Sequence, residues 1–203
     1  MDTKVKNPNH PDEGDDIKVE PIRNLKDIQN IKKNLQGNQR DFAIFVLGIN
    51  TNLRGVDMLK LKVGQLRQVG VGEDFRIIEQ KTGKERRITI NDAVYRAIQS
   101  LIDSMPKCQD EDYLFRSRQG NGKPISGPYL NNLVKKWCAG IKPSGSNFGA
   151  HTLRKTFGYH QRTLFDVDIP TLMVMFNHST QKQTLAYLGI QAKEIKTAYM
   201  NEI

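Results

Sequence analysis

Two arginines, two histidines and a late tyrosine are the residues of this chain whose types and order could do chemistry together. In chain order they are Arg54, His151, Arg154, His178 and Tyr187. Attack on a phosphodiester concentrates negative charge on its nonbridging oxygens, and planar guanidinium groups meet those oxygens with paired donors. The set would therefore suit an enzyme that breaks a DNA phosphodiester with a tyrosine nucleophile.

The spacing of these residues supports that chemistry. His151 and Arg154 are three residues apart, so on a helix both project from one face towards one phosphate. His178 can donate to a nonbridging oxygen, and His151 can hydrogen-bond to the attacking phenol or accept its proton. A tyrosine has an ordinary pKa of about 10, so Tyr187 needs cationic surroundings to act as a nucleophile near neutral pH.

The positive charge of the chain is unevenly spread. The net charge is +9, yet residues 1–20 hold three lysines and six acidic residues. The remainder holds 28 basic and 16 acidic residues, a net charge of +12. A body this basic favours a polyanionic partner, because each neutralised phosphate releases condensed counterions. Charge alone therefore favours nucleic acid as the partner.

Composition argues against several other classes of protein. The 203 residues are enough for one buried core, and no apolar run is long enough to span a membrane or to form an export signal. Cys108 and Cys138 form no metal-binding pattern, so we expect reduced thiols. Neither a Walker loop nor the carboxylate cluster of a metal nuclease occurs, so no cofactor is expected. We expect a cytoplasmic, nucleoid-associated protein with no membrane partner and no small-molecule substrate.

The elements that must position the candidate residues are mostly helices. Residues 1–20 are polar and rich in proline and glycine, which predicts a disordered tail, and residues 21–203 are expected to form one domain. Asn24 can cap a helix whose apolar stripe is Leu25, Ile28, Ile31 and Leu35. Residues 41–49 are apolar all round and predict a central buried helix. Further helices are expected after Asn91, from Ser126 and Pro128, and over 151–165, 169–177, 180–187 and 192–203.

One segment has the pattern of strands. Residues 75–79 and 87–90 flank a turn around Gly83, which predicts a β-hairpin. The expected fold is therefore mainly α with a small antiparallel β-hairpin, an α+β arrangement.

Three sequence boxes resemble those of the tyrosine recombinase (phage integrase) family. They are Asn52-Leu53-Arg54-Gly55, His151-Thr152-Leu153-Arg154, and Asn177-His178-Ser179 followed by Tyr187-Leu188-Gly189. The resemblance covers about residues 21–203. It implies the catalytic-domain fold of that family and DNA strand exchange through a 3′-phosphotyrosine. It also implies double-stranded DNA as partner and self-association on DNA as a dimer or tetramer.

The same resemblance assigns further residues. Lys81 in the hairpin matches the mobile lysine of the family and is the candidate acid for the leaving 5′-oxygen, with Lys84 three residues away as its rival. Asp57 is the expected partner of Arg54 one turn later. The basic residues that could contact the DNA backbone, or could equally be plain surface, are Lys84, Arg86, Arg87, Lys135, Lys136 and Lys155.

The chain departs from the family pattern at two places. Ala186 stands where an arginine commonly precedes the nucleophile, which leaves one DNA-backbone contact in doubt. Phe176-Asn177 replaces the more usual Leu-Gly before the histidine, which is a packing variant. The chain is also short, as expected of a naturally short recombinase or of an excised catalytic domain; Met1 and the acidic tail favour the former.

Two other functions use the same residues. A type IB topoisomerase shares the chemistry but exchanges no partners, and the short chain argues against it. A non-catalytic DNA-binding relic would be expected to have lost some of the catalytic residues, and none is lost: the chain keeps Arg54, Lys81, His151, Arg154, His178 and Tyr187. Tyr199 is the rival nucleophile, but it lacks the spacing from His178. The sequence therefore favours a site-specific integrase, resolvase or invertase.

Overall fold

The computed structural model describes residues 19–119, 121–141, 147–189, 196–197 and 199–202. The predicted tail 1–20 lies outside these residues except for 19–20, and the predicted helix 192–203 lies outside them except for 196–197 and 199–202. Within them the helices and strands are α1 Leu25–Asn34, α2 Gln39–Asn50, α3 Gly55–Met58, η1 Val63–Gln65, β1 Asp74–Ile78, β2 Glu85–Thr89, α4 Asp92–Asp103, α5 Gly127–Trp137, α6 Ala150–Phe165, α7 Ile169–Phe176 and α8 Gln181–Leu188.

Most of the predicted helices are confirmed, and their first residues follow from local capping. The side chains of Asn24, Asn91, Ser126 and Asp168 each accept a hydrogen bond from a backbone N–H in the first turn of α1, α4, α5 and α7. The short elements α3 and η1 were not predicted, because neither is long enough to show a helical period. Leu25 is a correction to the predicted stripe of α1, since its side chain is exposed.

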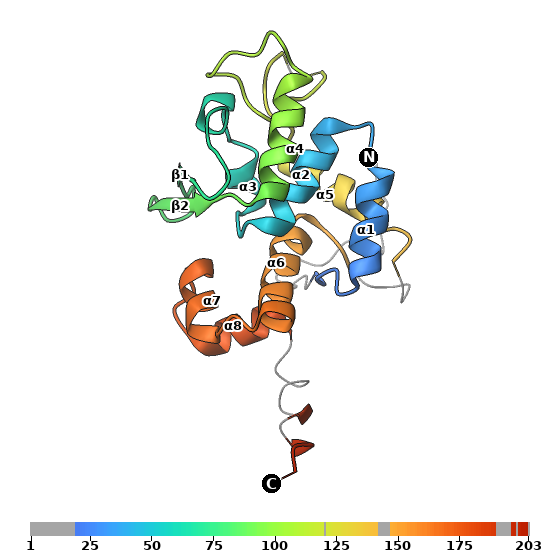
Figure 1. Cartoon of the computed structure of the whole chain (residues 1–203), viewed down its shortest axis with the longest axis vertical. Helices are drawn as coiled ribbons and strands as arrows, with labels where there is room; N and C mark the ends of the chain where they lie inside the picture. Colours follow the sequence, from blue (N-terminus) through green and yellow to red (C-terminus); the bar gives the residue numbers. More distant parts are fainter. Residues whose placement is uncertain (1–18, 120, 142–146, 190–195, 198, 203) are drawn as a thin grey trace, which may run out of the picture.

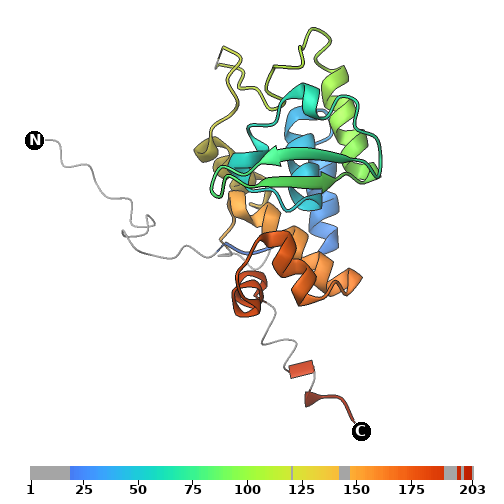
Figure 2. The same ribbon diagram turned by 90° about the vertical axis from the view of Figure 1, so that its left-hand side faces the viewer.

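The predicted hairpin is confirmed as the two-stranded antiparallel sheet of β1 and β2. Its register pairs Phe75 with Ile88 and Ile77 with Arg86, and Gly83 in the turn has a φ of +67°. Phe75, Ile77 and Ile88 are buried, so one face of the hairpin packs against the helices. In Figures 1 and 2 the hairpin lies beside α3 and α4, with α7 and α8 below it.

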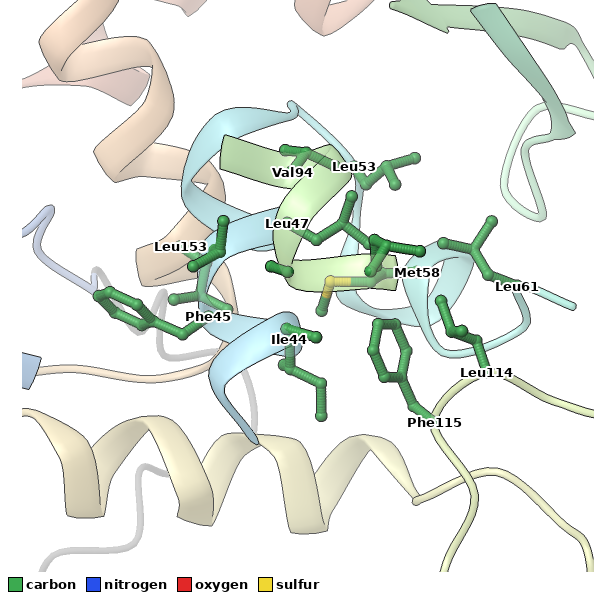
Figure 3. Packing of buried hydrophobic residues seen from close by; sticks show 14 of the residues in the cluster. Ile44, Phe45, Leu47, Leu53, Met58, Leu61, Val94, Leu114, Phe115 and Leu153 are labelled. Carbon is green, nitrogen blue, oxygen red and sulfur yellow. The ribbon is translucent and has the colours of Figure 1, made fainter. Parts of the chain in front are cut away.

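The main hydrophobic core surrounds α2, which is buried nearly all round as the sequence predicted. Figure 3 shows how side chains from α2, α3, α4 and α6 meet there, with Leu114 and Phe115 entering from the segment before α5. Gly48 brings α2 and α6 into close contact, because a Cβ at this position would lie 2.9 Å from the Cβ of Leu153. The core thus fixes the position of α6, the helix that carries His151 and Arg154.

A second, smaller cluster joins α6 to the two helices that follow it. Phe157, Tyr159, Leu172, Phe176 and Leu188 form its buried part, and Tyr187 packs against it. Gly158 makes this packing possible, since a Cβ there would lie 2.5 Å from the Phe176 ring and 2.6 Å from Leu188. The position of α7 and α8 is therefore set by their packing against α6.

The close approach at Gly48 predicts a stability effect. Gly48→Ala should lower the free energy of unfolding by about 1–3 kcal/mol, because the added methyl group forces α2 and α6 apart. Gly127→Ala, at the open first residue of α5, is the matched control and should leave the stability within about 0.5 kcal/mol or raise it slightly. Urea denaturation measures both, and equal effects of the two substitutions would contradict the packing argument.

Candidate active site

Three of the residues predicted first, Arg54, Arg154 and His178, lie near the buried hydroxyl group of a fourth, Tyr187. The hydroxyl oxygen of Tyr187 is buried, and no hydrogen-bond partner reaches it among the described residues. Its ring lies 5.2 Å from the His178 ring, and the charges of Arg154 and Arg54 act on its pKa. Burial nevertheless outweighs these two charges and raises the pKa of Tyr187 to about 12. The free protein therefore holds the phenol neutral, although its surroundings are cationic as expected.

His178 is fixed in this cluster by stacking and by one hydrogen bond. Its ring stacks on Phe176 with centroids 5.3 Å apart, and its Nδ1 lies 3.0 Å from the Thr184 hydroxyl of α8. Burial, aided by the charges of Arg154 and Arg54, lowers the pKa of His178 to about 4. The imidazole is therefore neutral near neutral pH. Asn177, before it, ends α7 in the left-handed conformation at φ 55°, which asparagine adopts more readily than most residues.

Arg154 is held by the end of α7. The residue is buried, its Nη2 donates to the Phe176 carbonyl at 2.9 Å, and its guanidinium lies over the Phe176 ring at 5.0 Å. Burial, together with repulsion from Arg54 and Arg86, lowers the pKa of Arg154 to about 10. The side chain stays charged near neutral pH and is aimed by the backbone that precedes His178.

Arg54 is held by a carboxylate that the sequence analysis did not single out. The Glu79 side chain is fully buried, and its Oε1 lies 2.6 Å from Arg54 Nη1 and 2.8 Å from Arg86 Nη1. Desolvation alone would raise the pKa of Glu79, but hydrogen bonds from Arg54, Arg86 and Thr82 lower it to about 2. The alternation of the hairpin could have revealed this residue, because Glu79 is in phase with the buried Phe75 and Ile77.

Asp57, the expected partner of Arg54, is more distant. Its Oδ2 lies 3.9 Å from Arg54 Nη1. Its Oδ1 accepts a hydrogen bond from the Gln80 backbone N–H at 2.9 Å. Asp57 thus anchors the hairpin turn, while Glu79 makes the closer contact with Arg54.

His151 and Lys81 complete the group from two exposed positions. His151 lies in the first turn of α6. Partial burial lowers its pKa, and the charges of Arg154, Lys155, Arg54 and Lys81 lower it further. Lys81 is exposed in the hairpin turn, near enough to act on His151. The charges of Arg54, Arg154 and Lys81 thus act on His151, and those of the two arginines also act on His178 and Tyr187.

The basic residues expected at the DNA surface differ in how exposed their side chains are. Lys84, Arg87, Lys135 and Lys136 are exposed, the last two in the final turn of α5. Lys155 lies with its Nζ 5.0 Å from the centre of the Tyr187 ring. Arg86 does not lie on the open surface as expected. Its side chain is only 16% exposed, and its guanidinium is bound to Glu79 and Asn52. Its phase in β2, with the buried Ile88 and Ile90, is the reason.

The described residues contain no group of three or more metal-ligating side chains that could hold a metal ion. They also contain no helix with the length and hydrophobicity needed to cross a membrane.

Comparisons with known proteins agree on one family. The sequence model described as "Phage integrase family" matches residues 23–194. The probable integrase/recombinase YoeC of Bacillus subtilis (strain 168) is 36% identical over 184 residues, which cover 89% of this chain and 95% of that protein. Tyrosine recombinase XerC of Caldanaerobacter subterraneus subsp. tengcongensis is 29% identical over 162 residues, 79% of this chain but 44% of that protein. This chain therefore spans less than half of that second relative.

Solved structures show the same fold. The crystal structure of XerA recombinase has a TM-score of 0.71 at 18% identity and covers 92% of this chain and 68% of its own. The XerH recombinase bound to its palindromic difH substrate, in a post-cleavage complex, has a TM-score of 0.68 at 15% identity and covers 83% of this chain and 48% of its own. The expected fold class is confirmed.

The low pKa of His178 predicts how stability depends on pH. Its ordinary value is 6.5 and its value in the folded protein is about 4. Between these values the unfolded chain binds a proton at His178 that the folded protein does not, so the free energy of unfolding should fall as the pH is lowered from 6.5 towards 4. The free energy of unfolding of His178→Gln should fall less steeply over the same pH range. Urea unfolding of both proteins at pH 7.5 and pH 5 tests this. An equal loss of unfolding free energy in the two proteins between these pH values would refute it.

Proposed function

The chain belongs to the phage integrase family, and from that premise we propose that it is a site-specific DNA recombinase that cleaves and rejoins DNA through a 3′-phosphotyrosine. The observation that carries this proposal is the unpaired, buried hydroxyl of Tyr187 among Arg54, Arg154 and His178. Two guanidinium groups and a neutral imidazole around a phenol offer hydrogen-bond donors to an anionic substrate. A phosphodiester of DNA supplies that anion in the geometry that guanidinium groups prefer.

The proposed reaction is a direct transfer at phosphorus. The Tyr187 oxygen attacks the phosphorus atom, its proton passes to His151, and the bond from phosphorus to the 5′-oxygen breaks. Lys81 protonates the leaving 5′-oxygen, while Arg54, Arg154 and His178 stabilise the charge on the nonbridging oxygens. The Thr184 hydroxyl lies 3.0 Å from His178 Nδ1 and thereby orients the ring. The energy of the broken bond stays in the phosphotyrosine, so a free 5′-hydroxyl can reverse the step without ATP.

The raised pKa of Tyr187 and the lowered pKa of Arg154 indicate a second role for the bound phosphate. Burial keeps the Tyr187 phenol neutral and makes the Arg154 charge costly. A bound phosphate would stabilise Arg154 and bring the scissile phosphorus to the phenol at the same time. Cleavage activity would then depend on DNA occupying the site.

The basic body of the chain supports double-stranded DNA as the partner, and we further propose that two to four copies assemble on it. Among similar structures, XerH is bound to a palindromic substrate and lambda integrase is a dimer bound to a core site. Relatives named as integrases and recombinases favour neither a type IB topoisomerase nor a non-catalytic relic.

The nucleophile can be tested with one atom removed. Tyr187→Phe keeps the ring contacts with Phe176 and Lys155 and deletes only a hydroxyl that has no hydrogen-bond partner among the described residues, so the fold should be unaffected. We expect DNA binding in a gel shift to match the wild type, with no covalent adduct on nicked suicide duplexes that carry candidate sites from beside the gene. Tyr199→Phe, at an exposed position, is the matched control and should form the adduct. An adduct from Tyr187→Phe would show that another residue is the nucleophile.

The proton donor can be tested with a modified leaving group. Lys81→Ala should slow cleavage about 100-fold or more, because the 5′-oxygen loses its acid. A substrate with sulfur at that bridging position needs no proton and should restore most of the rate. Lys84→Ala should be nearly as active as the wild type on both substrates. Sulfur rescue of Lys84→Ala instead would move the acid across the turn.

A further inference from the structure

The region between the hairpin and α7 contains a chain of polar contacts of which the proposed chemistry uses only Arg54. Glu79, Arg54, Arg86, Asn52 and Thr82 form it, and we call it the Glu79 network. Both oxygens of the Glu79 carboxylate are occupied: Oε1 by Arg54 and Arg86, and Oε2 by the Thr82 hydroxyl at 2.8 Å. The carboxylate has no exposed surface, so its charge interacts with protein groups and not with solvent.

The network extends to the segment that carries His178. Arg86 Nη2 donates to the Asn52 side-chain oxygen, and the Asn52 side-chain nitrogen donates to the Met175 carbonyl. The next carbonyl, that of Phe176, accepts from Arg154. Two consecutive backbone carbonyls at the end of α7 therefore accept hydrogen bonds, one from Asn52 and the other from Arg154.

Packing does not replace these contacts. A cavity of about 500 Å³ lies beside Asn52 and Arg86, and its apolar lining includes Phe157 and Met175. The hairpin and α7 face each other across this space. The polar links that border it connect the hairpin directly to the end of α7, in addition to the packing of α7 against α6.

Glu79 also fixes the turn that carries Lys81. Its backbone N–H donates to the Lys84 carbonyl at 3.0 Å, and its carbonyl accepts from the Gly83 N–H at 2.8 Å. The Thr82 hydroxyl adds a third link, from the turn to the carboxylate. The residue that binds Arg54 is thus also the base of the turn.

We propose that Glu79 is a positioning residue for recombination: through one buried carboxylate it sets the orientation of Arg54, of the Lys81 turn and, by way of Arg86 and Asn52, of the α7 end before His178. This inference rests on the proposed function. Glu79 touches no DNA; it acts by holding the groups that do. A displacement of about 1 Å in such groups can cost about 100-fold in rate.

The first test is Glu79→Gln, which keeps the shape of the side chain and removes its charge. The rate of adduct formation on a nicked suicide duplex, measured at saturating protein, should fall about 10- to 100-fold, while DNA affinity stays within about threefold of the wild type. The matched control is Glu85→Gln, the same change at an exposed carboxylate of the same hairpin, and it should cleave at the wild-type rate. Glu79→Gln cleaving as fast as Glu85→Gln would overturn the proposal.

The second test separates positioning from a loss of folding, and it uses an exposed residue. Thr82→Ala removes only the link between the turn and Glu79, and should slow cleavage about 3- to 10-fold. Thr82→Ser keeps the hydroxyl and should cleave like the wild type. A bridging sulfur at the 5′ position should erase the Thr82→Ala defect, because that defect acts through Lys81, and should rescue Glu79→Gln only in part, because Arg54 is also displaced.

These measurements distinguish the two proposals. No adduct from the wild-type protein on any candidate site would refute the proposed function. An active wild type with Thr82→Ala at full rate, or with a Thr82→Ala defect that sulfur leaves unchanged, would refute the positioning role of Glu79 alone.

Discussion

The active site depends on one electrostatic constraint: several cations must be held close together, partly out of water, before the phosphate arrives. Unpaired charges in such a place are costly, and like charges repel. The protein meets this cost with the fully buried carboxylate of Glu79, whose pKa of about 2 shows how strongly the ionised form is favoured. Its oxygens bind Arg54, Arg86 and Thr82, and the rest of the site is arranged around the guanidinium groups that it holds.

The remaining groups are positioned by α6 and by the small cluster that packs on it. Gly48 lets α6 lie close to the central helix α2, and Gly158 lets Phe176 and Leu188 lie close to α6. Phe176 then serves three groups at once: its carbonyl accepts from Arg154, and its ring contacts both His178 and Tyr187. The Phe176 ring thus supports both the imidazole and the phenol of the site.

The charge states of the free protein suit a site that acts only with DNA in place. Burial holds the Tyr187 phenol and the His178 imidazole neutral near neutral pH, although two arginines act on both. Added negative charge would favour the arginines, and the phosphate is the group that the family of this protein acts on. Burial therefore accounts for the neutral phenol and the neutral imidazole of the free protein.

Local patterns in the sequence determined most of the elements: caps at Asn24, Asn91, Ser126 and Asp168, the hairpin around Gly83, and the buried helix over 41–49. They also determined the six candidate catalytic residues, because residue type and order survive without coordinates. Only the tertiary structure decided which carboxylate holds Arg54, since Glu79 is 25 residues away in sequence and Asp57 only three. It also decided that Arg86 is half-buried against Glu79 and that Tyr187 is neutral, because burial and desolvation depend on neighbours that sequence spacing does not specify.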